Sequence, residues 1–246
     1  MSNMCKKIVL IILTLAVLSV TVYAWAYVNN KVKIDGVQVK PSGSEGLYIS
    51  NNENGSFSAI VTASTSTARA LSAVSTADLV NWYIPANSLN RTESGAYSSE
   101  FVSIDSATAS EYYFSENFYV KSTEGTGGLK ITGITVKNPD GTAPDENISS
   151  ALRVGIRTSS HKVFIFAPVE GYDSACSVIG EGGNATYQNI KASSNTTVIN
   201  AMQANEVNTL TVFVWYEGQD SNYNVNNLYN PEELVISIDF TVLPLN

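Results

Sequence analysis

The sequence has one histidine, two cysteines and few charged residues, and each shortage excludes a class of protein. A single imidazole excludes sites built from several histidines, such as a three-histidine zinc site or the HExxH motif of metalloproteases. Two cysteines cannot form the disulfide framework that holds a small domain together. Charged residues make up 15% of the chain, against about 25% in an average globular domain. A chain of 246 residues is long enough for a hydrophobic core to stabilise it without such links.

The charge balance is acidic, because 14 Lys and Arg stand against 22 Asp and Glu, which gives a formal net charge of −8. A protein that binds nucleic acid needs a basic surface to neutralise the phosphates. We therefore expect no nucleic-acid partner. The remaining surface is rich in Ser, Thr, Asn and Tyr, which provide uncharged hydroxyl and amide groups.

The N-terminal region has the features of a membrane-directed segment. Lys6 and Lys7 precede an uncharged and largely apolar run over residues 8–28. A basic segment followed by an apolar run is typical of a secretory signal peptide or a signal anchor. The positive-inside rule places the two lysines on the cytoplasmic side of the membrane. The sequence therefore predicts a hydrophobic signal or anchor helix over residues 1–28 and an exported domain over residues 29–246.

The sequence leaves open whether this segment is cleaved. The small residues Ala24 and Ala26 suit the cleavage site of a signal peptidase. However, the apolar run exceeds the roughly 7–15 residues of a signal-peptide core and can span a bilayer core of about 30 Å. Tyr23, Trp25 and Tyr27 also suit the membrane interface. The protein is expected either outside the cell or at the cell surface, held there by a single membrane helix if the segment is retained.

After the apolar run, hydrophobic residues alternate with polar ones, which is typical of strands. Residues 31–40 alternate in this way around Gly36, which predicts a half-buried strand with a bulge. Further strands are expected over residues 45–50, 57–62, 111–114, 117–123, 129–137, 151–157, 162–167, 209–216 and 233–242. Short segments at this spacing, rich in β-branched and aromatic residues, predict an all-β fold, a single antiparallel β-sandwich of jelly-roll type.

Little helix is expected beyond the N-terminal segment. Residues 76–81 can form one helical turn with Thr76 as its cap, and residues 194–205 can form another. The Ser/Thr/Ala-rich residues 62–76 are predicted to be a loop. No repeat with a period of 20–50 residues is present, so we expect one exported domain.

A polar cluster follows the strand predicted over residues 209–216. Glu217, Asp220 and Asn222 offer the hard oxygen ligands that Ca²⁺ prefers, although their spacing is not that of an EF-hand. The competing interpretation is a turn in which Gly218 adopts an unusual φ and Asp220 accepts backbone N–H groups. We favour the turn, and Ca²⁺ is the one cofactor for which the sequence offers candidate ligands.

The sequence offers little for catalysis. A Ser-His-Asp triad needs only one histidine, so the count alone permits it, but the Gly-x-Ser-x-Gly motif is absent. No pair of carboxylates is singled out for glycoside hydrolysis. We expect His161 to be a surface turn residue and the protein not to be an enzyme, with a secreted hydrolase as the weakest alternative. Several tyrosines are expected to be exposed and offer contacts to a glycan or a partner, with ordinary sheet packing as the competing interpretation, namely Tyr112, Tyr113, Tyr119 and Tyr223.

Several short segments resemble a known group of exported proteins. The run Thr21-Val22-Tyr23-Ala24-Trp25-Ala26-Tyr27-Val28 resembles the ending of signal peptides that the SipW-type peptidase processes. Proteins with that ending include the TasA/camelysin group of Gram-positive surface and biofilm-matrix proteins. The segments Gly46-Leu47-Tyr48-Ile49-Ser50 and Trp215-Tyr216-Glu217-Gly218-Gln219-Asp220 resemble parts of exported Firmicutes proteins that follow such a signal segment. The resemblance implies an exported jelly-roll protein that is held at the surface or assembled into fibres. The metallopeptidase activity described for camelysin is not implied, because this sequence lacks HExxH.

The leading functional hypothesis is a structural or interaction protein of the cell surface or extracellular matrix. Its expected partners are other copies of itself or other envelope and matrix proteins. The alternating segment near the N-terminus can be donated as a strand to the sheet of a neighbour. The apolar residues that such a donated strand would bury are Val32, Ile34, Val37 and Val39. A surface module that binds glycan or Ca²⁺ is the alternative.

Overall fold

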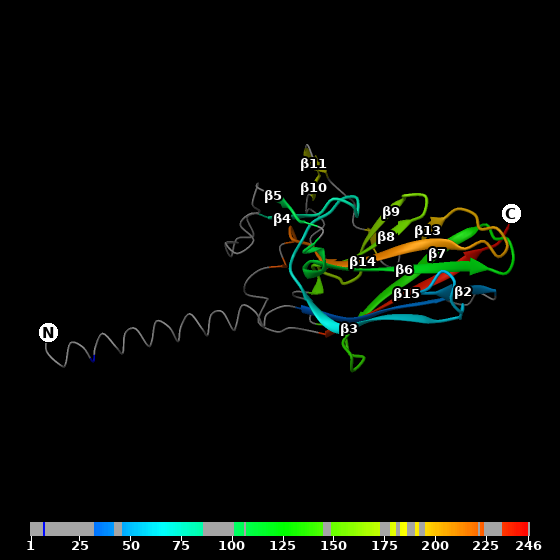
Figure 1. Cartoon of the computed structure of the whole chain (residues 1–246), viewed down its shortest axis with the longest axis horizontal. Coiled ribbons are helices and arrows are strands. Elements are labelled where there is room, and N and C mark those ends of the chain that lie inside the picture. The colour runs from blue at the N-terminus through cyan, green and yellow to red at the C-terminus, as the bar shows by residue number, and fades with distance from the viewer. Residues whose placement is uncertain are drawn as a thin grey trace.

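The computed structural model describes Lys7 and residues 32–41, 46–85, 101–105, 107–144, 149–172, 178–180, 183–185, 190–191, 195–220, 222–223 and 233–245. Within these residues the chain is mostly β-strand, with one 3₁₀ helix, η2 (Ala109–Glu111), so the all-β prediction is confirmed (Figure 1). Apart from Lys7, the predicted segment 1–28, including Ala24 and Ala26, lies outside the described residues. None of the helical residues described forms a span long and apolar enough to cross a membrane.

One sheet has five strands and contains β1 and β15, the first and last strands that the structure describes. Its order is β13 (Thr196–Ile199), β7 (Gly128–Lys137), β15 (Glu233–Leu243), β1 (Val32–Pro41) and β3 (Val61–Leu71). β1 is therefore an inner strand, parallel to β15 on one side and antiparallel to β3 on the other.

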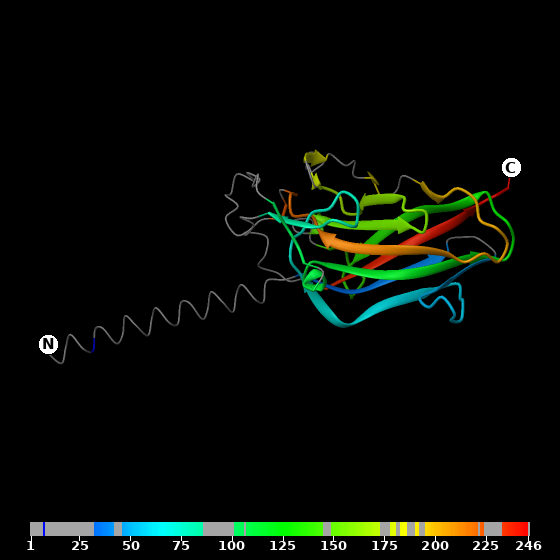
Figure 2. The same ribbon diagram turned by 45° about the horizontal axis from the view of Figure 1, so that its top comes forward.

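The second large sheet has six strands. Its order is β12 (Ile190–Lys191), β9 (Val163–Ala167), β8 (Leu152–Thr158), β14 (Asn208–Tyr216), β6 (Tyr113–Ser122) and β2 (Leu47–Ser50). Two smaller hairpins accompany these sheets, β4 (Tyr83–Pro85) with β5 (Phe101–Ser103), and β10 (Val178–Gly180) with β11 (Gly183–Ala185). Figure 2 shows the orange β14 and the red β15 running in different layers.

The two large sheets enclose a common hydrophobic core. Alternate residues of the inner strands supply it, for example Leu210, Val212 and Val214 from β14, which pack with Ile236 and Ile238 of β15. All five side chains are fully buried. The alternation that predicted these strands therefore also identified their core-facing residues, because successive side chains of a strand point to opposite faces.

Two strand pairings among the described residues are parallel, and for these the prediction of an antiparallel arrangement was wrong. β1 runs parallel to β15, and β9 runs parallel to β12. Parallel neighbours cannot be joined by a short turn, so each pair is made by segments that are far apart in the sequence. Local patterns report on hairpins and therefore did not reveal these two pairs. The bulge predicted in β1 is confirmed by a register shift between Ile34 and Gly36 against both neighbouring strands.

Where the sequence pattern was weak, several predicted strands, loops and helical turns were wrong. β3 occupies residues that were assigned to a strand over 57–62 and a loop over 62–76, because its Ser, Thr and Ala residues resemble a loop. Pairing with β1 satisfies its backbone groups and overrides that local preference. The helical turns predicted at 76–81 and 194–205 are absent from the described residues, where β13 replaces the second. The two strands predicted over 111–123 form a single strand, β6, preceded by η2.

Candidate functional site

The predicted Ca²⁺ ligands Asp220 and Asn222 lie in a buried turn at the end of β14. The Asp220 Oδ2 accepts a hydrogen bond from Nη2 of Arg153 at 2.6 Å in an ion pair whose side chains are both 0% exposed. The Asp220 Oδ1 accepts hydrogen bonds from the backbone N–H and the side-chain amide of Asn222, at 3.0 and 2.8 Å. The same amide also donates to the carbonyl of Gly171 at 2.8 Å. Both carboxylate oxygens of Asp220 therefore have protein partners.

Glu217 is fully buried in the same turn. Its Oε1 accepts hydrogen bonds from the Ser75 hydroxyl and from the backbone N–H of Gln219, the latter at 3.1 Å. Its Oε2 accepts one from Nε1 of Trp215 at 3.3 Å. Burial raises the pKa of Glu217 above its ordinary value, and the bond from Ser75 and the charge of Arg153 counteract only part of that effect. The carboxylate thus joins β14 to the segment around Ser75.

These contacts match the turn interpretation in one respect and correct it in another. Asp220 does accept a backbone N–H, as predicted. Gly218 does not have a positive φ, so that part of the prediction was wrong. Within the described part of the chain, no group of three or more His, Cys, Asp and Glu side chains is arranged to hold a metal ion.

His161 lies in the turn between β8 and β9, as the sequence predicted. It is exposed, has a φ of 61°, and donates its backbone N–H to the carbonyl of Thr158 at 2.9 Å. The four tyrosines that were expected to be exposed are half-buried, and only Tyr113 and Tyr119 lie in a strand, β6. Tyr113, for example, stacks on Trp82 with ring centroids 4.0 Å apart. Sheet packing therefore occupies part of the aromatic surface that glycan binding would need.

The residues predicted for strand donation lie in β1. Val37 and Val39 are 0% exposed and belong to the common core. Val32 pairs with Leu71 of β3, and Ile34 pairs with Leu234 of β15. The alternating segment is therefore built into a sheet of its own chain, with a strand on each side.

A second feature is a groove on the outer face of the six-stranded sheet, the face turned away from the common core. Residues 72–85, here called the covering segment, lie over one end of this face. Val74 in this segment donates its backbone N–H to the carbonyl of Tyr216 and accepts one from Gly218, both at 3.0 Å. Buried side chains from the segment and the sheet form a second hydrophobic cluster there, which contains Val74, Leu79, Trp82, Ile165, Phe213 and Trp215.

Gly155 of β8 allows the covering segment to approach the sheet. A Cβ atom at this position would lie 2.6 Å from Cδ2 of Leu79 and 2.9 Å from Cζ3 of Trp215. Leu79 itself has a φ of 57°, and its backbone N–H is held by Oγ1 of Thr76 at 3.0 Å. The glycine and the Thr76 cap together place Leu79 on the sheet surface.

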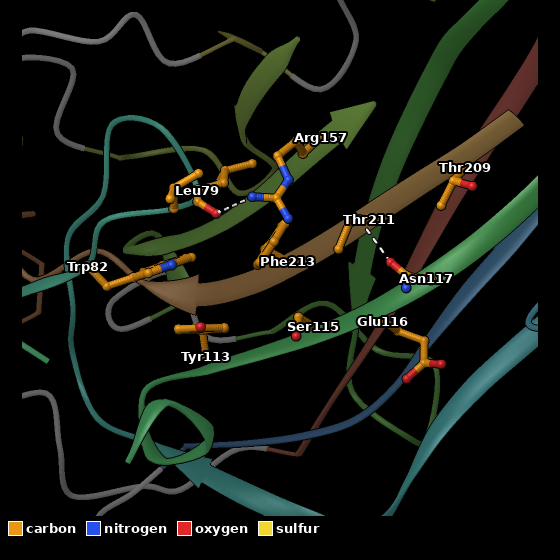
Figure 3. A pocket seen from close by; sticks show the side chains of 11 residues that line it. Leu79, Trp82, Tyr113, Ser115, Glu116, Asn117, Arg157, Thr209, Thr211 and Phe213 are labelled. Carbon is orange, nitrogen blue, oxygen red and sulfur yellow. Dashed lines mark hydrogen bonds between the residues drawn. The ribbon is translucent and has the colours of Figure 1, made fainter. Parts of the chain in front are cut away.

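The groove begins where the covering segment ends and has a volume of about 630 Å³ (Figure 3). Its floor comes from outward-facing residues of three adjacent strands. The lining residues are Leu79, Val80, Trp82, Tyr113, Ser115, Glu116, Asn117, Arg157, Thr209, Thr211 and Phe213. Thr211 donates its hydroxyl hydrogen to Oδ1 of Asn117 at 2.9 Å. Burial raises the pKa of Tyr113, and the charge of Arg157 opposes this effect.

The groove was not predicted from the sequence. The signal was present in the outward positions of β6 and β14, which are Ser115, Asn117, Thr209 and Thr211, small polar residues that alternate with core residues. Nothing local indicated that these positions, together with Arg157, lie side by side on neighbouring strands.

Comparisons with models of protein families, with curated proteins and with solved structures found no match to this chain. The resemblance to the TasA/camelysin group therefore stays a prediction.

Proposed function

We propose that this chain is an exported structural protein of the cell surface or extracellular matrix, and that its copies assemble into fibres by exchanging β1. The proposal includes the finer architecture, a single β-sandwich of jelly-roll type, and a cleaved or retained N-terminal segment that directs export. Two sheets around one core are compatible with that architecture. No catalytic role is proposed for any residue.

The position of β1 is the observation that supports this proposal. β1 fills the space between β15 and β3, and it contributes Val37 and Val39 to the common core. Withdrawing it would leave backbone groups of both neighbours unpaired and would open the core along one strand. Such a gap can be filled by an identical strand from a second copy, which restores the same contacts.

Exchange of this kind leads to a fibre. If each copy gives its β1 to the next copy and receives one from the previous copy, the contact is head-to-tail and need not close into a ring. β1 is followed by Ser42-Gly43-Ser44-Glu45-Gly46, a short segment that connects it to β2 in the other sheet. In the exchanged form this connection would have to serve as the hinge, and short connections favour such exchange.

A disulfide placed across the β1–β15 pair tests the exchange. Gln38 and Ser237 are paired in register, and Oγ of Ser237 donates to Oε1 of Gln38 at 3.4 Å. The variant carries Gln38→Cys and Ser237→Cys in the full chain, with Cys5→Ser and Cys176→Ser to remove the native thiols. We expect fibres assembled under reducing conditions and then oxidised to give a ladder of covalent multimers on a non-reducing gel. Oxidation before assembly should prevent fibres.

The control is the single variant Gln38→Cys in the same background, which cannot form a ladder beyond a dimer. If electron microscopy shows fibres but the oxidised protein migrates as a monomer on the gel, β1 stays in its own chain. Absence of fibres from the reduced double variant and from the native chain would contradict assembly itself.

A surface binding module is the second candidate, and the groove over the six-stranded sheet favours it. The Ca²⁺ version has less support, because Glu217 and Asp220 already accept hydrogen bonds from protein groups. A ligand that binds only the folded state raises the melting temperature. We therefore expect no difference in melting temperature between millimolar Ca²⁺ and chelator, and a rise with Ca²⁺ would restore the metal hypothesis.

A further inference from the structure

We propose that the groove over β8, β14 and β6 binds a carboxylated saccharide chain, with Arg157 as the receptor for a carboxylate. This site lies on the six-stranded sheet and is separate from the exchange of β1, which belongs to the five-stranded sheet. It therefore adds a ligand to the proposed function and does not depend on fibre assembly.

Arg157 is held in place but is not neutralised. Its Nη1 donates to the carbonyl of Leu79 at 3.2 Å, and its guanidinium lies 5.4 Å from the ring centroid of Phe213 (Figure 3). In the part of the chain that the structure describes, no carboxylate forms an ion pair with it. A guanidinium has five N–H donors in a rigid fork that matches a carboxylate. A fixed and half-buried arginine of this kind is already arranged to receive an anion.

The groups beside Arg157 are small, neutral and polar. In the pairing of the strands, Thr211 stands opposite Arg157 on one side and opposite Asn117 on the other. Ser115 and Thr209 extend this polar floor along the strands. Hydroxyl and amide groups both donate and accept hydrogen bonds, as do the hydroxyl groups of a sugar. One cation among neutral hydroxyl groups thus fits a ligand rich in hydroxyls with one carboxylate per binding unit.

The shape and the lining favour a saccharide over an acidic peptide. The groove is open along the sheet and its volume of about 630 Å³ can hold a short segment of a chain. Trp82 and Phe213 are each only 5% exposed, so Val80, which is 60% exposed, is the one exposed large hydrophobic side chain that the lining offers to a peptide. The one carboxylate of the lining, Glu116, points away from Arg157 toward the opposite side of β6 (Figure 3).

The test measures binding of a uronic-acid oligosaccharide to the full chain in a mild detergent, by calorimetry at low salt. A neutral glucan of equal length and a glutamate-rich peptide are the comparison ligands. We expect the uronate to bind best and its Kd to rise with added salt. Arg157→Gln should weaken that binding roughly tenfold or more, because a charge-assisted bidentate contact is lost. Arg157→Lys should recover part of it, since the charge returns without the fork.

Lys162→Gln is the matched control, because Lys162 is exposed in the turn after β8 and its replacement removes the same charge outside the groove. Thr211→Val removes one hydroxyl from the floor and should weaken binding by a few-fold. Melting temperatures of all variants show whether the fold is retained. Equal losses in Arg157→Gln and Lys162→Gln would overturn the site. Equal binding of the neutral glucan, tighter binding of the peptide, or no binding of the uronate to the native chain would overturn the ligand class.

Discussion

The outer face of the six-stranded sheet has two ends, and the same three strands build both. At one end the covering segment of residues 72–85 buries the sheet, and at the other end the face is open and forms the groove. Two arginines of β8 make the contrast clear. Arg153 is 0% exposed and paired with Asp220, whereas Arg157 is half-buried and pairs with no described carboxylate. Both lie on the same face of one strand, since they are four residues apart.

This contrast shows that the depth of burial decides the role of each outward side chain. Burial makes an unpaired charge costly, so the buried charged side chains at the covered end, Arg153, Glu217 and Asp220, all have protein partners. Arg153 donates to the carbonyls of Ser150 and Leu152, both at 2.9 Å, in addition to its ion pair. At the open end, water can form hydrogen bonds with the same kinds of polar side chain, so these side chains stay available for a ligand.

Asp220→Ala should have the largest effect, because it leaves the guanidinium of Arg153 buried without its counter-charge. Removing one partner of a buried ion pair costs about 3–5 kcal/mol of the free energy of unfolding. Arg157→Gln, at the open end, should cost less than about 1 kcal/mol. Urea unfolding of both variants measures the difference. Similar losses of the free energy of unfolding in the two variants would mean that side chains at the covered end contribute no more to stability than those at the open end.

Gly155→Ala should have the next largest effect. The added methyl group would meet Leu79 and Trp215 at less than 3 Å, and overpacking of this kind costs about 1–3 kcal/mol. Gly133→Ala is the matched control, because its Cβ would meet only Oδ2 of Asp239 at 3.6 Å. Adding Leu79→Ala to Gly155→Ala should recover part of the lost stability. If it does not, Leu79 is not what excludes a side chain at position 155.

The sequence predicted the strands whose pattern is local. β7, β14 and β15 alternate clearly, and their boundaries agree with the predicted ranges to within one residue or so. β3 was missed because a strand of Ser, Thr and Ala depends on its neighbour for stability. The parallel position of β1 was missed because its partner β15 comes from the other end of the chain.

The sites were harder to predict than the strands. The sequence correctly singled out Glu217 and Asp220 as a polar turn, but their partners Ser75 and Arg153 are far away in the sequence. Whether an acidic residue is a metal ligand or part of a buried network depends on those partners. The groove depends on strand register in the same way, since Arg157, Thr211 and Asn117 become neighbours only through the pairing of three strands.

The pH dependence of stability should also separate two acidic residues linked to the covering segment. Burial raises the pKa of Glu217 above 4.5, so its favourable contribution is complete below pH 4.5 and is lost as pH rises through its folded-state pKa. For Asp78, burial also raises the pKa, but hydrogen bonds from Asn81 and Val80 outweigh it and lower the pKa below 3.8. Its contribution is present above pH 3.8 and is lost as pH falls through the folded-state pKa.

Unfolding of Glu217→Gln and Asp78→Asn at several pH values measures these contributions as differences from the native chain. The stability advantage of the native chain over Glu217→Gln should shrink as pH rises, and its advantage over Asp78→Asn should shrink as pH falls. If the stability difference from the native chain changed in the same direction with pH for both variants, the opposite effects of burial and hydrogen bonding would be contradicted.

The smallest effect is expected from Thr211→Val at the open end. This substitution keeps the shape of the side chain and removes an exposed hydrogen bond to Asn117, so it should change the free energy of unfolding by less than about 0.5 kcal/mol. The same substitution at Thr76, in the covered end, removes a buried hydroxyl that accepts from the N–H of Leu79 and donates to the carbonyl of Asn81 at 2.8 Å. That loss should cost about 1–3 kcal/mol, because the backbone N–H of Leu79 stays buried without its partner. Equal costs at the two positions would mean that water reaches both ends of the face, and that the open groove is not the distinct, solvated surface on which ligand binding depends.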